Sequence, residues 1–217
     1  PIEEQAIPRI EECFNGEWTD WTWNVLDIDN AHCREIVDNV VDMAHFFYVH
    51  YSFPTYFKNV FAGHVATQFQ KGVGRMDVHP RASQGGAARV TGNTSVASYH
   101  GPSFMIDDLT YHYQDGDVDS VLINCHYPTS DNSFKLQYGL MVKKIEGLSD
   151  EDNARIAEKY STLFGEGFLQ DVHIWQNKSP IENPLLCEED GPVYQLRRWY
   201  EQFYVDAAEV TDEMTQR

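Results

Sequence analysis

The chain has 217 residues, 42% of them apolar, and its 34 acidic and 16 basic residues give a formal net charge of −18. The length and composition predict one folded domain and exclude a disordered chain, and the charge repels nucleic-acid phosphates and anionic lipid surfaces. No apolar run reaches the roughly 20 residues of a transmembrane helix and the first residues form no signal peptide, so we expect a cytoplasmic protein with no nucleic-acid partner and no membrane insertion.

The first elements follow from two hydrophobic periods. Residues 18–29 alternate aromatic or aliphatic with polar side chains, which is typical of a strand. From about residue 31 to 47, apolar side chains recur at spacings of three and four, which predicts one amphipathic helix. Pro54 ends that helix at the latest.

The rest of the chain predicts a sheet followed by helices. Between residues 63 and 144, segments rich in Val, Thr, Tyr and Phe alternate with turn-like segments such as QDGD and PTSDN, which predicts an antiparallel sheet of about five or six strands. Ser149 and the acids after it start a helix that can run to about Lys178, with a weak point at residues 165–167. A last helix covers about 193–205. The fold class is α+β, in which a sheet can curl round a helix.

Two histidines in the first predicted helix are candidates for chemistry. On a helix, Asp38, Asp42 and His45 lie within about 60° of one another and form a stripe. His50 lies roughly 140° round from His45, so the two imidazoles meet only if the helix loosens between them. The stripe can simply face water, or the histidines can be core residues bonded to backbone carbonyls. The apolar segments FFYV and YSFPTYF beside them argue against a solvated helix end.

Two neutral imidazoles and one carboxylate suit a divalent first-row metal and leave positions open for oxygen, as in the facial triad of non-haem iron oxygenases. The late segment GEGFLQDVHIWQNK offers Glu166, Asp171 and His173 as a third ligand. Asp171 is favoured because Phe168 and Trp175, three and four residues away, place aromatic rings beside it. Glu166 fits a solvated turn, and His173 points about 200° away from Asp171.

Three separated motifs carry a family resemblance. The stretches DNVVDMAHFFYVHYSFPTYFKNVFAGHVATQ, QDVHIWQNK and NPLLCEEDGPVYQLRRWYEQFYVD occur in this order. Together they resemble the catalytic domain of the oxygenase component of 3-ketosteroid 9α-hydroxylase, a Rieske non-haem iron monooxygenase. The resemblance covers residues from about 18 to 206.

The resemblance implies a helix-grip (START-like) domain with a curved antiparallel sheet wrapped round a long C-terminal helix. It implies mononuclear Fe(II) held by His45, His50 and Asp171. It gives Asp42 a catalytic role, because in such enzymes this acid hydrogen-bonds the first histidine and links it to the Rieske histidine of a neighbouring subunit. A carboxylate that orients an imidazole ligand agrees with this role.

The resemblance also implies a steroid pocket. Its expected lining residues are Val40, Gln68, Tyr99, Met105, Asn124, Phe168 and Trp175. Asp107 stands where a neutral amide facing the ligand is expected, so this residue bears on the exact substrate.

The resemblance extends the expected assembly beyond this chain. The family's N-terminal domain binds a [2Fe-2S] Rieske cluster through CxH and CxxH, and the four cysteines of this chain form neither pattern. We therefore expect residues 1–217 to be the catalytic domain of a longer oxygenase whose Rieske domain is absent from this chain. The implied partners are a steroid substrate, O2, a ferredoxin-type reductase that draws on NADH, and further copies in a homotrimer.

Two other hypotheses fit the same sequence. A helix-grip sterol- or lipid-binding module would take up a hydrophobic ligand without redox chemistry and without iron. A Rieske oxygenase acting on another hydrophobic substrate, such as an aromatic acid or a bile-acid side-chain thioester, would keep the iron and change the product.

Overall fold

A curved antiparallel sheet dominates the fold. The computed structural model describes residues 5–74, 90–179 and 181–215, and within these residues seven strands form one sheet in the order β1-β7-β6-β5-β4-β3-β2. The strands are β1 (Thr22–Asp29), β2 (Ser52–Ala62), β3 (Val65–Gly74), β4 (Val90–His100), β5 (Phe104–Tyr113), β6 (Gly116–Ser130) and β7 (Ser133–Val142). All neighbouring pairs are antiparallel, so the predicted sheet is confirmed and is extended by β1 and β2.

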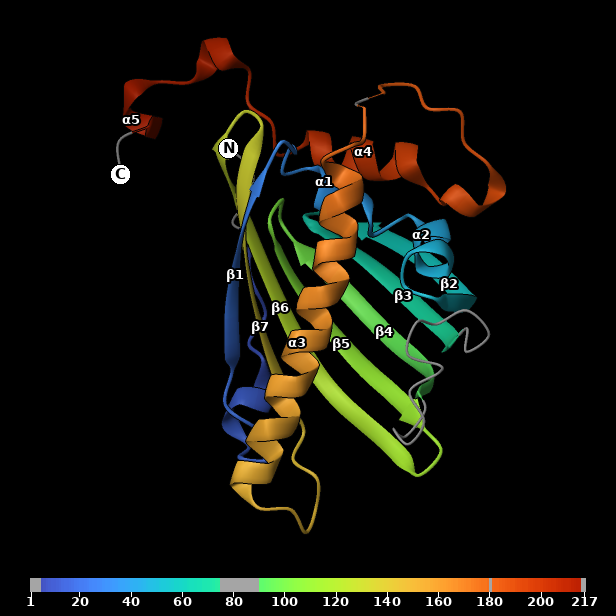
Figure 1. The fold of residues 1–217 in the computed structure, drawn as a ribbon. Helices are drawn as coiled ribbons and strands as arrows, with labels where there is room; N and C mark the ends of the chain where they lie inside the picture. The colour runs from blue at the N-terminus through green and yellow to red at the C-terminus, as the bar shows by residue number, and fades with distance from the viewer. Residues whose placement is uncertain (1–4, 75–89, 180, 216–217) are drawn as a thin grey trace.

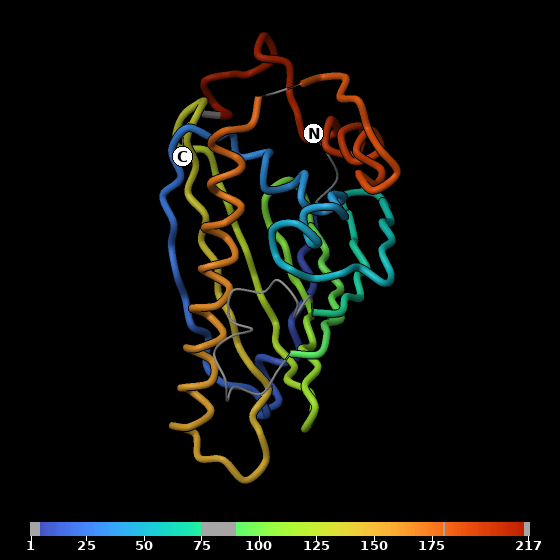
Figure 2. The backbone as a smooth tube through the Cα atoms, turned by 45° about the vertical axis from the view of Figure 1, so that its right-hand side comes forward, coloured from blue at the N-terminus to red at the C-terminus, as the bar shows by residue number. Residues whose placement is uncertain are grey.

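One long helix covers part of the inner face of the sheet. Helix α3 (Asp150–Trp175) packs against β7 and β1, and the sheet curves round it (Figure 1, Figure 2). Asn24 on β1 donates a hydrogen bond of 2.7 Å to Ser161 on α3. The shorter helices are α1 (Glu35–Asp38), α2 (Met43–Tyr48), α4 (Val193–Glu201) and α5 (Asp212–Thr215), with 3₁₀ turns at Glu11–Phe14, Glu188–Asp190 and Ala207–Glu209.

The single helix predicted over residues 31–47 is wrong. The chain forms α1, breaks, and restarts as α2, because Asp42 adopts an extended backbone (φ −85°, ψ 92°) and caps α2 by accepting a hydrogen bond from the His45 amide. The apolar spacing of three and four residues still correctly indicates which side chains are buried. Ile36, Val37 and Val41 are each at most 4% exposed in the main core cluster.

The predicted stripe of Asp38, Asp42 and His45 holds only for Asp42 and His45, which contact each other. Asp38 is buried and lies 3.2 Å from the Lys178 ammonium, which also lies 2.6 Å from Glu35. These charges tie α1 to the chain just beyond the end of α3. A buried carboxylate needs such a partner, so Asp38 belongs to a structural ion-pair cluster away from the histidines.

Strand β2 was not predicted, although Pro54 is consistent with it. β2 is an edge strand, and its register with β3 shifts between Pro54 and Tyr56. Proline lacks an amide hydrogen and is tolerated at sheet edges and bulges. Helix α2 ends at Tyr48, so Pro54 comes after the turn into β2 and does not itself end the helix.

The predicted weak point at residues 165–167 does not interrupt α3. Gly165 lies where the helix approaches the sheet closely. A Cβ at Gly165 would lie 2.5 Å from the Tyr138 hydroxyl oxygen, whereas a Cβ at Gly167 would have its nearest neighbour, Cε1 of His50, at 4.0 Å. The ring of Tyr138 is itself buried and packs against Phe168 in a tilted arrangement.

We expect Gly165→Ala to lower the free energy of unfolding and Gly167→Ala to leave it unchanged or raise it. Alanine favours a helix interior over glycine by up to about 1 kcal/mol, and overpacking a core costs about 1–3 kcal/mol. Chemical denaturation of the two variants measures the difference. Equal gains in both would show that Tyr138 moves aside freely and that the close approach is unimportant.

Candidate metal centre and cavity

Two histidines from helix α2 and the turn after it converge with one aspartate from helix α3. The ligand atoms of His45, His50 and Asp171 all lie within 4.8 Å of one another, and this is the group of potential metal ligands found among the described residues. Nε2 of His50 lies 3.3 Å from Oδ1 of Asp171. The ring centroids of the two histidines are 5.1 Å apart in an edge arrangement. The meeting of the two imidazoles, which required the helix to loosen, is confirmed.

The end of helix α2 brings the two imidazoles together. His45 lies in the first turn of α2, and His50 follows Val49, the residue that caps its C-terminus. Tyr51 then adopts a left-handed conformation with φ 55°, which is uncommon for a residue other than glycine and often marks a functional site. This turn leads directly into β2. Asp171 reaches the same point from the last two turns of α3.

Neighbouring groups fix which nitrogen of each ring remains available. Nδ1 of His45 hydrogen-bonds the backbone carbonyl oxygen of Asp42, and Nδ1 of His50 lies 3.4 Å from Oε1 of Gln170. A carbonyl oxygen accepts, so Nδ1 of His45 carries the hydrogen and its Nε2 keeps the lone pair. Nε2 of His50 faces the Asp171 carboxylate and is available to a metal only when it carries no hydrogen. Metal-ligating histidines usually donate their other N–H in this way.

The electrostatics of the two rings differ. Burial lowers the pKa of His45, and the adjacent His50 lowers it further, so this ring is held neutral. Burial also opposes protonation of His50, but the hydrogen bond and the charge of Asp171 outweigh it, and the pKa of His50 is raised. A neutral imidazole is a ready ligand, whereas His50 must give up a proton to a metal.

These residues fit a divalent metal. Ligand atoms bound at about 2.1 Å lie roughly 3 Å apart when their bonds are near 90–100°, and the separation of 3.3 Å between His50 and Asp171 already matches this. The Asp171 side chain is only 8% exposed, and such a buried carboxylate faces two nitrogens with one negative charge. A cation among these three groups would satisfy all of them.

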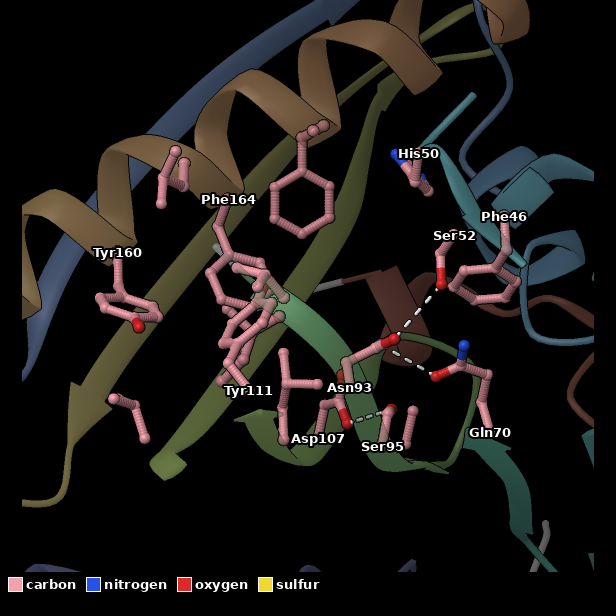
Figure 3. A pocket seen from close by; sticks show the side chains of 18 of the residues that line it. Phe46, His50, Ser52, Gln70, Asn93, Ser95, Asp107, Tyr111, Tyr160 and Phe164 are labelled. Carbon is pink, nitrogen blue, oxygen red and sulfur yellow. Dashed lines mark hydrogen bonds between the residues drawn. The ribbon is translucent and has the colours of Figure 1, made fainter. Parts of the chain in front are cut away.

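A large cavity opens beside the cluster. It has a volume of about 1500 Å³, and His45, His50 and Asp171 are part of its wall. Strands β3 to β6 form one side and helix α3 the other (Figure 3). Six of the seven residues expected to contact a steroid line it: Val40, Gln68, Tyr99, Met105, Asn124 and Phe168.

Trp175 is not among the residues that line the cavity. It is 3% exposed and packs in the core against Phe134, and its Nε1 donates a hydrogen bond of 3.4 Å to Asn39. Four residues advance a helix by about 6 Å, which carries Trp175 from the level of Asp171 to the end of α3. Its substrate contact stays a prediction, with the side chain placed in the core rather than in the cavity wall.

The other candidate ligands stay apart from the cluster. His173 is exposed on α3, and Glu166 lies on the helix rather than in the turn expected for it, at the rim of the cavity.

Several polar residues of the cavity were not singled out from the sequence. Asn93 donates a hydrogen bond of 3.0 Å to Gln70 and lies 3.3 Å from the Ser52 hydroxyl. Ser95 donates a hydrogen bond of 2.6 Å to Asp107. The strand alternation could have indicated them, because Asn93, Ser95 and Tyr99 share one face of β4.

Asp107 is buried in the cavity wall and is 9% exposed. Among the described residues, no Lys, Arg or His forms an ion pair with it. Burial raises the pKa of Asp107 from 3.8 to about 6, although the hydrogen bond from Ser95 lowers it. The sequence singled out this position, and the structure shows an ionisable group in the cavity wall.

We expect Asp107→Asn to stabilise the protein at pH 8 and to have little effect at pH 4. Between about pH 4 and 6 the folded state binds more protons than the unfolded state, so the free energy of unfolding falls as the pH rises. The raised pKa of about 6 corresponds to a penalty of up to about 3 kcal/mol above pH 6, which the amide removes. Denaturation of both proteins at the two pH values tests this; the same difference at both would contradict it.

None of the helices in the described part of the chain has both the length and the hydropathy needed to cross a membrane.

Solved structures of other proteins share this fold. The crystal structure of dicamba monooxygenase bound to 3,6-dichlorosalicylic acid is similar with a TM-score of 0.64 and 14% identity, covering 91% of this chain and 62% of that one. The chain therefore shares its fold with a monooxygenase. The likeness shows the fold, and the cluster adds a candidate metal centre to it.

Comparison with protein families gives the narrower assignment. The family model described as the 3-ketosteroid 9alpha-hydroxylase C-terminal domain matches residues 1–204, and the chain belongs to this family. The oxygenase component of a 3-ketosteroid-9-alpha-monooxygenase from Rhodococcus rhodochrous is 58% identical over all of this chain and 54% of its own length. One from Mycobacterium tuberculosis is 53% identical over all of this chain and 55% of its length. The chain spans about half the length of the curated relatives it matches.

Proposed function

We propose that residues 1–217 are the catalytic domain of a 3-ketosteroid 9α-monooxygenase and that His45, His50 and Asp171 hold mononuclear Fe(II). One observation carries the proposal: the three potential ligands meet in the wall of a large cavity, in a chain of this family. The names of the relatives supply the substrate class. When bound, the iron would supply the activation of O2 for hydroxylation at C9.

The residues of this chain would hold and orient the steroid. The cavity combines apolar wall for the ring system with polar side chains such as Gln70, Asn93 and Asp107. Tyr99 donates a hydrogen bond of 3.5 Å to Asn124, whose amide contacts the Met105 sulfur at 3.6 Å. These groups can hold an oxygen of the steroid. Orientation matters because a displacement of about 1 Å can cost roughly a hundredfold in rate.

We propose a wider assembly that agrees with the length of the relatives. In this assembly, the sheet wrapped round α3 would be the helix-grip domain. A separate domain with a [2Fe-2S] Rieske cluster would deliver electrons from an NADH-dependent, ferredoxin-type reductase. In a cytoplasmic homotrimer, Asp42 would link the Rieske histidine of a neighbouring subunit to His45. Asp42 suits this role because its side chain is 42% exposed while that of His45 is 9% exposed.

Metal and product analysis tests the proposal. The full-length protein that contains this chain should hold about one mononuclear iron per chain and, with reductase and NADH, convert a 3-ketosteroid to its 9α-hydroxylated product. Uptake of a sterol without iron would instead establish a ligand-binding module. Iron with turnover only of an aromatic acid or a bile-acid side-chain thioester would assign a different substrate.

A further inference from the structure

Asp107 is a carboxyl in the cavity wall that is hydrogen-bonded to Ser95 and has apolar neighbours on both adjacent strands. On the inner face of the sheet its neighbours across β4 and β6 are Ala97 and Leu122. Met105 and Leu109, two residues before and after it on β5, share the same face. Figure 3 shows Asp107 and Ser95 on the strand side of the cavity, with Tyr160 and Phe164 projecting from α3 on the other side.

The hydrogen bond between Ser95 and Asp107 uses the only hydrogen of the pair, so what remains for a ligand is hydrogen-bond acceptors. The Ser95 hydroxyl has one hydrogen and donates it to Oδ1 of Asp107 at 2.6 Å. A carboxylate offers about four lone-pair positions, so Ser95 leaves several of them available. Of the nearby amides, Asn93 donates to Oε1 of Gln70. Nε2 of Gln70 is a buried donor with no hydrogen-bond partner among the described residues, and it lies outside the Asp107–Ser95 pair. The titratable groups that influence the site are Asp108, on the opposite face of β5, and Tyr111, four residues further along.

We propose that Asp107 is a specificity-determining residue that accepts a hydrogen bond from a hydroxyl group of the substrate. The proposal rests on the proposed function and deepens it: the preferred 3-ketosteroids keep the ketone at C3 and carry a hydroxyl, rather than a second ketone, at C17, the end that would face β5. A ketone oxygen is an acceptor only. It would face the carboxylate oxygens without a hydrogen between them, and it would remove water from a charged group without replacing its hydrogen bond.

The size of this discrimination follows from the same argument. A site built to hydrogen-bond a hydroxyl rejects an analogue that lacks it more strongly than an apolar pocket rejects an extra methylene. Asparagine has almost the same shape as aspartate, but its amide can donate to a ketone. Replacing the carboxylate with the amide therefore changes the preference without changing the volume of the cavity.

Equilibrium binding at pH 8 to the iron-loaded full-length protein tests the proposal without any catalytic step. One matched pair of 3-ketosteroids is measured, with either a hydroxyl or a ketone at C17. We expect the hydroxyl form to bind at least about tenfold more tightly. In Asp107→Asn this ratio should fall to within about twofold.

Asp108→Asn is the matched control, because it removes the same charge from the exposed side of the same strand; it should keep the wild-type ratio. An unchanged ratio in Asp107→Asn, or a preference of the wild-type protein for the C17 ketone, would overturn the proposal while leaving steroid binding intact. Failure of the wild-type protein to bind either steroid would overturn the proposed function as well.

Discussion

Asp171→Asn is expected to reduce the iron content from about one per chain to a small fraction and to lower product formation by at least about 100-fold. The amide keeps the size of the side chain but removes the negative charge that faces His45 and His50. Without it, two imidazoles remain, and His50 loses the partner 3.3 Å from its Nε2. Metal analysis of freshly purified protein and steroid product analysis measure the two effects.

His173→Ala is the matched control for this experiment. It changes a histidine two residues further along the same helix, on the exposed side, and should keep both iron and activity. His50→Ala should behave as Asp171→Asn does. Circular dichroism shows whether each variant is folded. Full iron occupancy in folded Asp171→Asn and folded His50→Ala would refute the assignment of this cluster.

The sequence predicted α3 and most of the sheet, because these elements have strong local patterns. Ser149 does cap α3, accepting a hydrogen bond from the Asp152 amide. The sequence failed at residues 31–47, where the apolar spacing of three and four reports that the side chains are buried but not that the helix is continuous. The conformation of Asp42 breaks the helix, and the periodicity of its neighbours does not show this.

The candidate site was predictable only in part. His45 and His50 are close in sequence, whereas Asp171 lies more than a hundred residues away, and the residues alone left Glu166 and His173 open. Which of Glu166, Asp171 and His173 reaches the two histidines depends on how α3 lies on the sheet. The same dependence explains Trp175, which has the right spacing from Asp171 but lies beyond the cavity, against Phe134.

Asp42→Asn is expected to keep the iron and to lower NADH-driven product formation by about 10- to 100-fold. Asparagine caps helices about as well as aspartate, so α2 and both histidines should stay in place. The carboxylate that lies 4.0 Å from Nδ1 of His45 is lost, and with it the charged group that we propose for electron entry. Iron content, thermal unfolding and product formation distinguish these effects.

Asp42→Ala separates the capping role from the proposed electron transfer. It removes the acceptor for the His45 amide, 3.0 Å away, and should cost about 1 kcal/mol of stability in addition to the loss of turnover. If Asp42→Asn keeps its turnover within about twofold while Asp42→Ala loses it, Asp42 acts only by capping α2 and orienting His45 through its backbone carbonyl. If both variants lose turnover and only Asp42→Ala loses stability, the charge itself is required, because the two proteins then share only the missing carboxylate.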